Sequence, residues 1–105
     1  MADARFRKAD DWEVSMFARH GEVDTNQLTH AFAEVHERGE AGTWIPVWNF
    51  LCDLCGTRSA RKFQADDLYI PVWIHDYFGG RHEEWRVVVF FREEHHAFAF
   101  KMRWG

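Results

Sequence analysis

The spacing of hydrophobic residues changes from a helical to a strand-like period along this 105-residue chain. In the first half, hydrophobic residues recur every three or four positions, which is typical of one buried helix face. Beyond the basic segment TRSARK, residues 57–62, they alternate with other residues instead, as they do in strands. The pattern predicts an α+β protein in which N-terminal helices pack on a small antiparallel C-terminal sheet.

Three helices are expected, at about 10–20, 25–38 and 46–55. The first has acidic residues in its first turn and basic ones in its last, with Trp12 and Met16 on one face. A strand is the alternative interpretation, because Trp12, Val14 and Met16 also occupy every second position. The second has the pattern of a capping box, with Asp24 as the cap and Gln27 three positions later.

The third helix begins near a proline and ends at a glycine. Pro46 suits the first turn, where its missing N–H is not needed, and Gly56 is a typical C-terminal stop. Its hydrophobic residues cover most of its circumference, and both cysteines of the chain, Cys52 and Cys55, lie in its last turn. A helix this apolar is expected to be buried.

The sheet is expected to contain strands at about 68–75, 85–91 and 96–104. Pro71 cannot donate a ladder hydrogen bond, so the first of these should be an edge strand. YFGGRHEE, residues 77–84, is interpreted as a connecting loop. The last two strands are predicted to form a hairpin in which Val89 lies opposite Phe98 on a buried face, with Val88 on a mixed face.

Size and composition favour one domain over residues 1–105, with residues 1–9 flexible. The longest apolar run, VVVFF, is far too short to span a membrane. No leader with a basic start and an apolar core opens the chain, so the expected location is the cytoplasm, with both cysteines reduced.

The two halves of the chain differ in charge. Residues 1–56 carry ten acidic residues against five basic ones, a net charge of −5, and residues 57–105 carry seven against eight, a net charge of +1. Proteins that bind nucleic acid usually present a basic face. Direct binding to nucleic acid is therefore not expected.

The two cysteines allow three interpretations: a redox pair, a zinc site or core packing. A redox pair needs an acidified thiol, and the C-terminal end of a helix has the wrong dipole for that. Zinc would need two histidine ligands from elsewhere, His75 and His82, or else His95 or His96. Core packing is favoured because the cysteines fit a helical apolar face without a metal. We therefore expect no metal and no cofactor, and a zinc-stabilised binding module is the first alternative.

Catalytic motifs are absent from the sequence. There is no phosphate-binding loop, no nucleophile elbow and no paired-histidine metalloprotease motif. The interpretation is therefore a non-catalytic protein, and an enzyme built around His75, Asp76 and His82 is the third hypothesis.

The closing stretch WRVVVFFREEHHAFAFKMRWG resembles the last two strands of RelE/ParE-type toxins, small ribosome-linked or gyrase-directed proteins. The resemblance covers about a fifth of the chain and rests on an aromatic-rich hairpin with arginines. The acidic N-terminal half departs from the basic pattern of these toxins, so no activity is carried over.

The remaining interpretation is a small acidic protein that binds, and inhibits or regulates, another protein. The chain holds six tryptophans and ten phenylalanines, more than a core of this size needs, and protein interfaces are enriched in such residues. In size and charge it is comparable to immunity proteins and phage anti-defence (anti-CRISPR-like) proteins, whose partners include basic nucleases and nucleoprotein complexes. A homodimer is left open. The predicted binding residues surround the connecting loop and comprise Trp73, Tyr77, Phe78, Glu83 and Glu84.

Overall fold

Strands and helices are interspersed along the chain. The computed structural model describes residues 5–34, 45–58, 62–78 and 82–105, with backbone alone for 75–78 and 82–85. The elements in these ranges are β1 (Phe6–Lys8), α1 (Asp11–Gly21), β2 (His30–Glu34), α2 (Ile45–Cys55), β3 (Tyr69–Phe78), β4 (His82–Phe91) and α3 (Glu94–Trp104). The predicted α+β class is confirmed. No helix in the described ranges is both long enough and apolar enough to cross a membrane.

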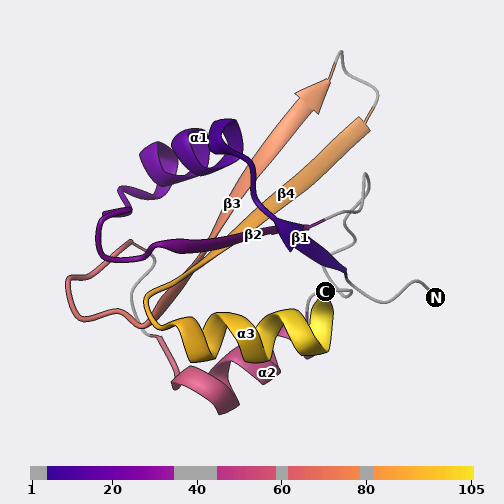
Figure 1. The fold of residues 1–105 in the computed structure, drawn as a ribbon. Helices are drawn as coiled ribbons and strands as arrows, with labels where there is room; N and C mark the ends of the chain where they lie inside the picture. Colours follow the sequence, from indigo (N-terminus) through magenta and orange to yellow (C-terminus); the bar gives the residue numbers. More distant parts are fainter. Residues whose placement is uncertain (1–4, 35–44, 59–61, 79–81) are drawn as a thin grey trace.

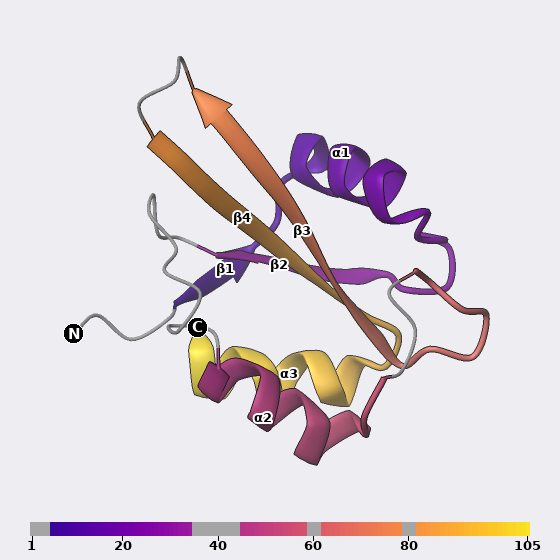
Figure 2. The same cartoon turned by 180° about the vertical axis from the view of Figure 1, so that it is seen from behind.

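The strands form one antiparallel sheet in the order β1-β2-β4-β3, and helices cover both of its faces. Figures 1 and 2 show α1 on one face and the neighbouring helices α2 and α3 on the other. Side chains alternate across β4, so its buried residues divide between two cores. Val88 and Phe90 pack in the core under α1, whereas Val87, Val89 and Phe91 pack in the core under α2 and α3.

The first strand and the last helix share the second of these cores. Phe6 of β1 and Phe100 of α3 meet edge to face, with ring centroids 4.9 Å apart. The prediction that residues 1–9 are flexible is wrong for Phe6–Lys8, because Phe6 is buried and this segment pairs with β2. Residues 1–4 lie outside the described residues.

Helix α1 confirms the prediction of a helix at residues 10–20. The Asp10 side chain accepts from the Glu13 backbone N–H, and the Glu13 side chain accepts from the Asp10 backbone N–H, which completes a capping box. Phe17 is buried, but Trp12 is 59 % exposed. The helix also approaches β3 closely at Gly21, where a Cβ would lie 2.7 Å from a Val72 methyl group.

The prediction of a helix at 25–38 is wrong. Asp24 does start a turn, since its side chain accepts from the Asn26 N–H and its carbonyl accepts from the Leu28 N–H. The chain then enters β2, which pairs with β1 on one side and β4 on the other. All three middle residues of β2 are buried, because this strand lies inside the sheet with both faces covered. Residues 35–38 lie outside the described residues.

The predicted strand at 96–104 is also wrong, because these residues belong to α3. Ala97, Phe100 and Trp104 are buried at helical spacing, whereas Phe98 is exposed. Val89 therefore lies opposite Phe32 and Pro71, and the hairpin partner of β4 is β3. Because the closing stretch is one strand followed by a helix, the hairpin on which the toxin resemblance rests does not form.

The predictions for 46–55 and 68–75 are confirmed, by α2 and by the edge position of β3. Gly56 ends α2 with a φ of 93° and donates its N–H to the Cys52 carbonyl. The Leu68 carbonyl accepts from the Arg92 N–H at 3.0 Å. Because inward and outward groups alternate along a strand, Pro71 falls at an outward position, where a missing N–H costs no bond to β4.

Candidate functional site

The outer half of the β3–β4 hairpin extends beyond the rest of the sheet (Figure 1). β3 pairs with β4 from Tyr69–Phe91 to Phe78–His82, whereas β2 pairs only with residues 88–91 of β4. Residues 73–78 and 82–87 therefore form a two-stranded ribbon, called the β3–β4 ribbon below. An isolated two-stranded hairpin is only marginally stable in water. At the base of the ribbon, Val87 and Ile74 still pack in the two cores.

The base of the ribbon carries a stacked pair of tryptophans. Trp73 of β3 packs nearly parallel to Trp48 of α2, with ring centroids 5.2 Å apart and an interplanar angle of 20°. Trp48 is half-buried against the core, while Trp73 keeps 41 % of its surface exposed. Ile45, one turn before Trp48, is 58 % exposed. Stacking holds Trp73 in one orientation, so little of its rotamer entropy is left to lose on binding.

The structure brings the predicted binding residues together, but as paired strands and not as a loop. Tyr77 lies opposite Glu83, and Phe78 lies opposite His82. Glu84 lies opposite Asp76, and Trp73 lies opposite Val87 at the base of the ribbon. The prediction of a connecting loop over residues 77–84 is wrong for 77–78 and 82–84, which belong to β3 and β4. Residues 79–81 lie outside the described residues.

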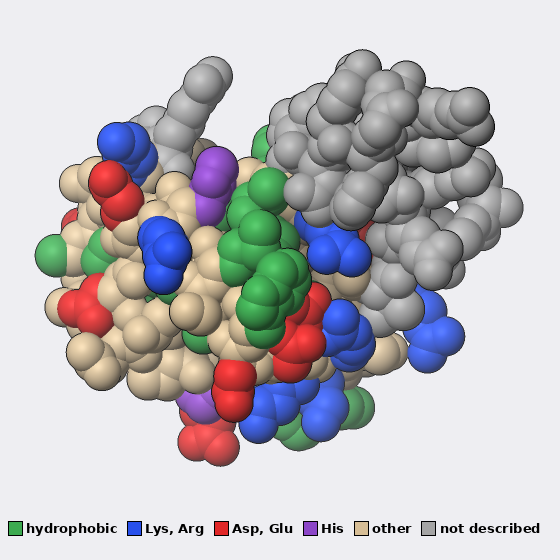
Figure 3. All heavy atoms as spheres, turned by 90° about the horizontal axis from the view of Figure 1, so that it is seen from above, with side chains coloured by type: hydrophobic (Ala, Val, Ile, Leu, Met, Phe, Trp, Pro, Cys, Tyr) green, Lys and Arg blue, Asp and Glu red, His purple; other side chains and the backbone are tan. Residues whose placement is uncertain are grey.

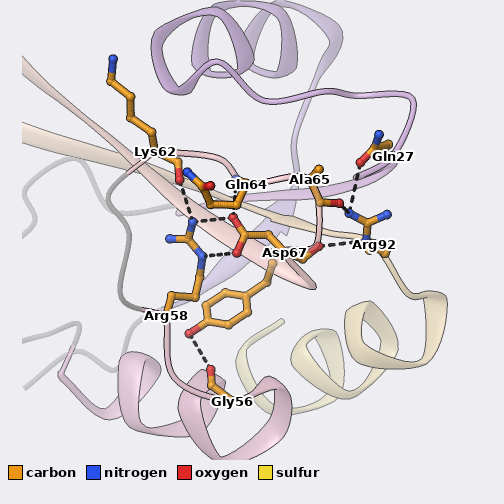
Figure 4. Close-up of polar contacts among 9 residues, drawn as sticks. Gln27, Gly56, Arg58, Lys62, Gln64, Ala65, Asp67 and Arg92 are labelled. Carbon is orange, nitrogen blue, oxygen red and sulfur yellow. Dashed lines mark hydrogen bonds and ion pairs between the residues drawn. The ribbon is translucent and has the colours of Figure 1, made fainter.

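An enclosed ion pair fixes the segment that leads into β3 (Figure 4). Arg58 donates to both carboxylate oxygens of Asp67, at 3.2 and 2.6 Å, and the same carboxylate accepts from the Gln64 backbone N–H. Arg92, at the end of β4, donates to the backbone carbonyls of Asp67 and Ala65. Because these charged groups bind other groups of the same chain, the arrangement is typical of one that holds a segment in place and not of a binding site.

A hollow of about 450 Å³ lies next to this ion pair. Its lining includes Cys55, Arg58 and Tyr69, and the Tyr69 hydroxyl donates to the Gly56 carbonyl at 3.2 Å. Burial, followed by the nearby Cys52, raises the pKa of Tyr69 to about 12. A phenol held protonated in this way is a poor general base near neutral pH.

The cysteines lie in the last turn of α2, as predicted, and both are half-buried free thiols. Burial raises the pKa of Cys55 to about 11. A redox-active thiol needs a shift in the opposite direction. Together with the partial burial of both side chains, this shift favours packing over thiol chemistry.

The histidines proposed as zinc ligands fall into two groups. His95 and His96 lie in the first turn of α3, with ring centroids 4.1 Å apart. Burial and then His95 lower the pKa of His96, while Glu93 acts in the opposite direction. His75 pairs with Trp85 and His82 with Phe78, at different positions along the ribbon. Within the described ranges, no three His, Cys, Asp or Glu residues are grouped so that they could hold a metal ion.

The outer face of α1 carries a second set of exposed hydrophobic side chains. Trp12 and Met16, one turn apart, are 59 % and 37 % exposed. Figure 3 views the molecule from the α1 side and shows hydrophobic side chains gathered with acidic and basic ones around them. Glu13 of this helix forms a two-bond ion pair with Arg7 of β1. The sequence pattern places Trp12 and Met16 on one face of this helix, and in the structure both are exposed.

Sequence reasoning missed Trp48 as part of the candidate surface. It lies on a helix and reaches Trp73 of a strand only through the fold, so no local spacing indicates the contact. No family model matches the chain, and no curated protein or solved structure matches it either.

Proposed function

We propose that the protein acts in the cytoplasm, without catalysis, by binding and inhibiting or regulating another protein through the β3–β4 ribbon and the Trp48–Trp73 pair at its base. The observation that carries this proposal is the ribbon itself, a two-stranded extension rich in aromatic residues with a stacked, partly exposed tryptophan beside it. Interface hot spots are typically aromatic side chains held in place and surrounded by polar residues.

The proposed partner has a basic surface, such as a nuclease or a nucleoprotein complex. The chain as a whole carries a net charge of −4, and the ribbon contains Asp76, Glu83 and Glu84. Opposite charge speeds the encounter of two proteins and sets its salt dependence. Nucleic acid itself is not the proposed target, since basic and acidic residues are interspersed throughout the chain.

The test begins with affinity capture from a host lysate and mass spectrometry to obtain the partner. Replacing Tyr77 and Phe78 together by alanine should then weaken binding to the purified partner by at least about 2 kcal/mol, the hot-spot range. The matched control is Trp12→Ala, which removes an exposed aromatic side chain from α1 and should leave binding unchanged. Replacing Glu83 and Glu84 by lysine should slow association and reduce its dependence on salt.

Melting temperatures separate this proposal from a structural role of the ribbon. The Tyr77 and Phe78 double variant should melt close to the wild type. If it melts much lower while the purified partner still binds with unchanged affinity, the ribbon is part of the core and the proposal is wrong.

A further inference from the structure

Helix α3 has apolar residues on two opposite faces. One face, Ala97, Phe100 and Trp104, is buried against the sheet and α2. On the other face, Phe98 is 63 % exposed and Met102 is 72 % exposed, one helical turn apart. A helix on the surface of a globular protein normally turns polar side chains outward. The outer face of α3 therefore has the apolar character of a helix face that packs against another helix.

The charges beside this outer stripe are arranged so that the face complements itself. Glu94 and Lys101 are both exposed and lie seven residues, or two turns, apart, so they share one flank of the stripe. Rotation by 180° about an axis between them exchanges the acidic and basic ends. When two copies of such a helix pack antiparallel, this flank meets the same flank of the other copy, which places each glutamate opposite a lysine.

One small residue on the other flank allows close approach. Ala99 lies there, beside Phe98 and Met102, and carries no side chain beyond a methyl group. The exposed His95, one turn before Phe98, continues the stripe toward the N-terminal end of α3. His95, Phe98 and Met102 thus occupy the spacing i, i+3 and i+7, which is the seam spacing of paired helices.

We propose that the outer face of α3 is a homodimer interface in which the α3 helices of two copies pack antiparallel about a two-fold axis. Phe98 of each copy packs next to Phe98 of the other near the axis, Met102 of each copy lies toward His95 of the other, and Glu94 of each copy lies opposite Lys101 of the other. Closed two-fold pairing of this kind is the commonest form of protein oligomer. The proposal is independent of the proposed function, because it uses a different element and a different face.

The expected dimer is weak. An 11-residue helix is only about 16 Å long, so two such helices bury less than the roughly 1,000 Å² that stable interfaces exceed. Dissociation constants of about 10 µM to about 1 mM suit a contact of this size. Sedimentation velocity over that concentration range should show a reversible monomer–dimer equilibrium.

Charge exchange tests the pairing directly in the full chain. Glu94→Lys alone and Lys101→Glu alone each place like charges opposite one another, so each should weaken dimerisation about 10-fold. The double variant restores opposite charges and should dimerise like the wild type. An equimolar mixture of the two single variants should form heterodimers more tightly than either variant pairs with itself, because all facing charges are then opposite.

Phe98→Glu should abolish the dimer without lowering the melting temperature, since Phe98 contributes little to the core. Trp12→Glu, an equivalent change on α1, should leave the dimer intact. A protein that stays monomeric up to about 1 mM overturns the proposal. So does a dimer that survives Phe98→Glu, which would use another surface such as the β3 edge, and so does a mixture of the single variants that forms no preferential heterodimer.

Discussion

The Arg58–Asp67 ion pair joins the end of α2 to the start of β3 through two nearly buried side chains. These are 12 % and 13 % exposed, whereas the Lys62–Glu22 pair is 75 % and 67 % exposed with its atoms 3.7 Å apart. Solvent and salt weaken an exposed ion pair much more than an enclosed one. Removing one partner of the enclosed pair leaves the other with an unpaired charge in a nearly buried position.

Asp67→Ala should therefore lower the free energy of unfolding by about 2–4 kcal/mol. The change also removes the acceptor of the Gln64 backbone N–H. Glu22→Ala, the matched control, should change the free energy of unfolding by at most about 0.5 kcal/mol. Urea titrations measure the free energy of unfolding of both variants. Equal losses in the two variants would show that Asp67 stabilises the protein no more than a surface charge does.

Cys55 gives the protein a pH-dependent stability in the alkaline range. Its pKa rises from the ordinary 9.0 to about 11 on folding because of burial. Between these values the folded protein binds more protons than the unfolded chain, so stability is complete below pH 9 and falls as the pH rises toward 11.

The free energy of unfolding of the wild type should accordingly fall by about 1 kcal/mol between about pH 8 and about pH 10.5. This figure takes about half of the effect of the full pKa shift of Cys55, because solvent screens the partly exposed thiol. Cys55→Ala should lose less over the same interval. Tyr69, whose pKa of about 12 also exceeds its ordinary 10.0, adds to the loss in both proteins. Urea unfolding at the two pH values measures the difference, and identical losses would contradict the assignment to Cys55.

At the scale of elements, β4 is the strand on which both cores depend. Val88 is 1 % exposed toward α1, and Val89 is fully buried toward α2 and α3. The sequence pattern placed Val88 on a mixed face because Arg86 and Lys101 were expected on the same side. A helix on the second face makes the two positions equivalent in burial.

Val88→Ala and Val89→Ala should each cost about 2 kcal/mol through lost burial and a small cavity. Val14→Ala, at a half-buried position of α1, should cost less than about 1 kcal/mol. Denaturant titration of the three variants tests this. A much smaller loss at Val88 than at Val89 would mean that α1 does not cover the sheet as described.

The sequence could predict an element where local and tertiary preferences agree, as in α1 and α2. It failed at β2, because the Asp24 turn is real but strand pairing on both sides overrides helix propagation beyond Leu28. Gln27, expected to close a capping box there, instead accepts from Arg92 at the end of β4. No local pattern indicates so distant a partner.

At α3, the sequence did contain signals for a helix. Alternation of Phe98, Phe100 and Met102 was interpreted as a strand, although the i, i+3, i+7 spacing of Ala97, Phe100 and Trp104 predicts a helix equally well. Glu94 in the first turn and Lys101 and Arg103 in the last are further helix signals.

At the scale of the whole molecule, the α+β class could be predicted because it depends only on the mixture of periods along the chain. The layering could not, since it requires knowing that the last segment is a helix and that the sheet needs cover on both faces. Of the contacts in the candidate surface, the sequence indicates only those between residues that are close in the chain. The binding residues chosen from the sequence are neighbours in the chain and meet in the ribbon, whereas the stacking of Trp48 on Trp73 depends on the assembled fold.

The edge-to-face contact of Phe6 with Phe100 also bears on the order in which the protein assembles. Contacts between residues distant in the chain form only after the entropy of closing the intervening loop has been overcome. The β3–β4 hairpin closes a short loop, so its pairing can form early, whereas the core that Phe6 and Phe100 share requires nearly the whole described chain to be in place. Topology of this kind slows folding, and we expect the contact between Phe6 and Phe100 to be among the last to form.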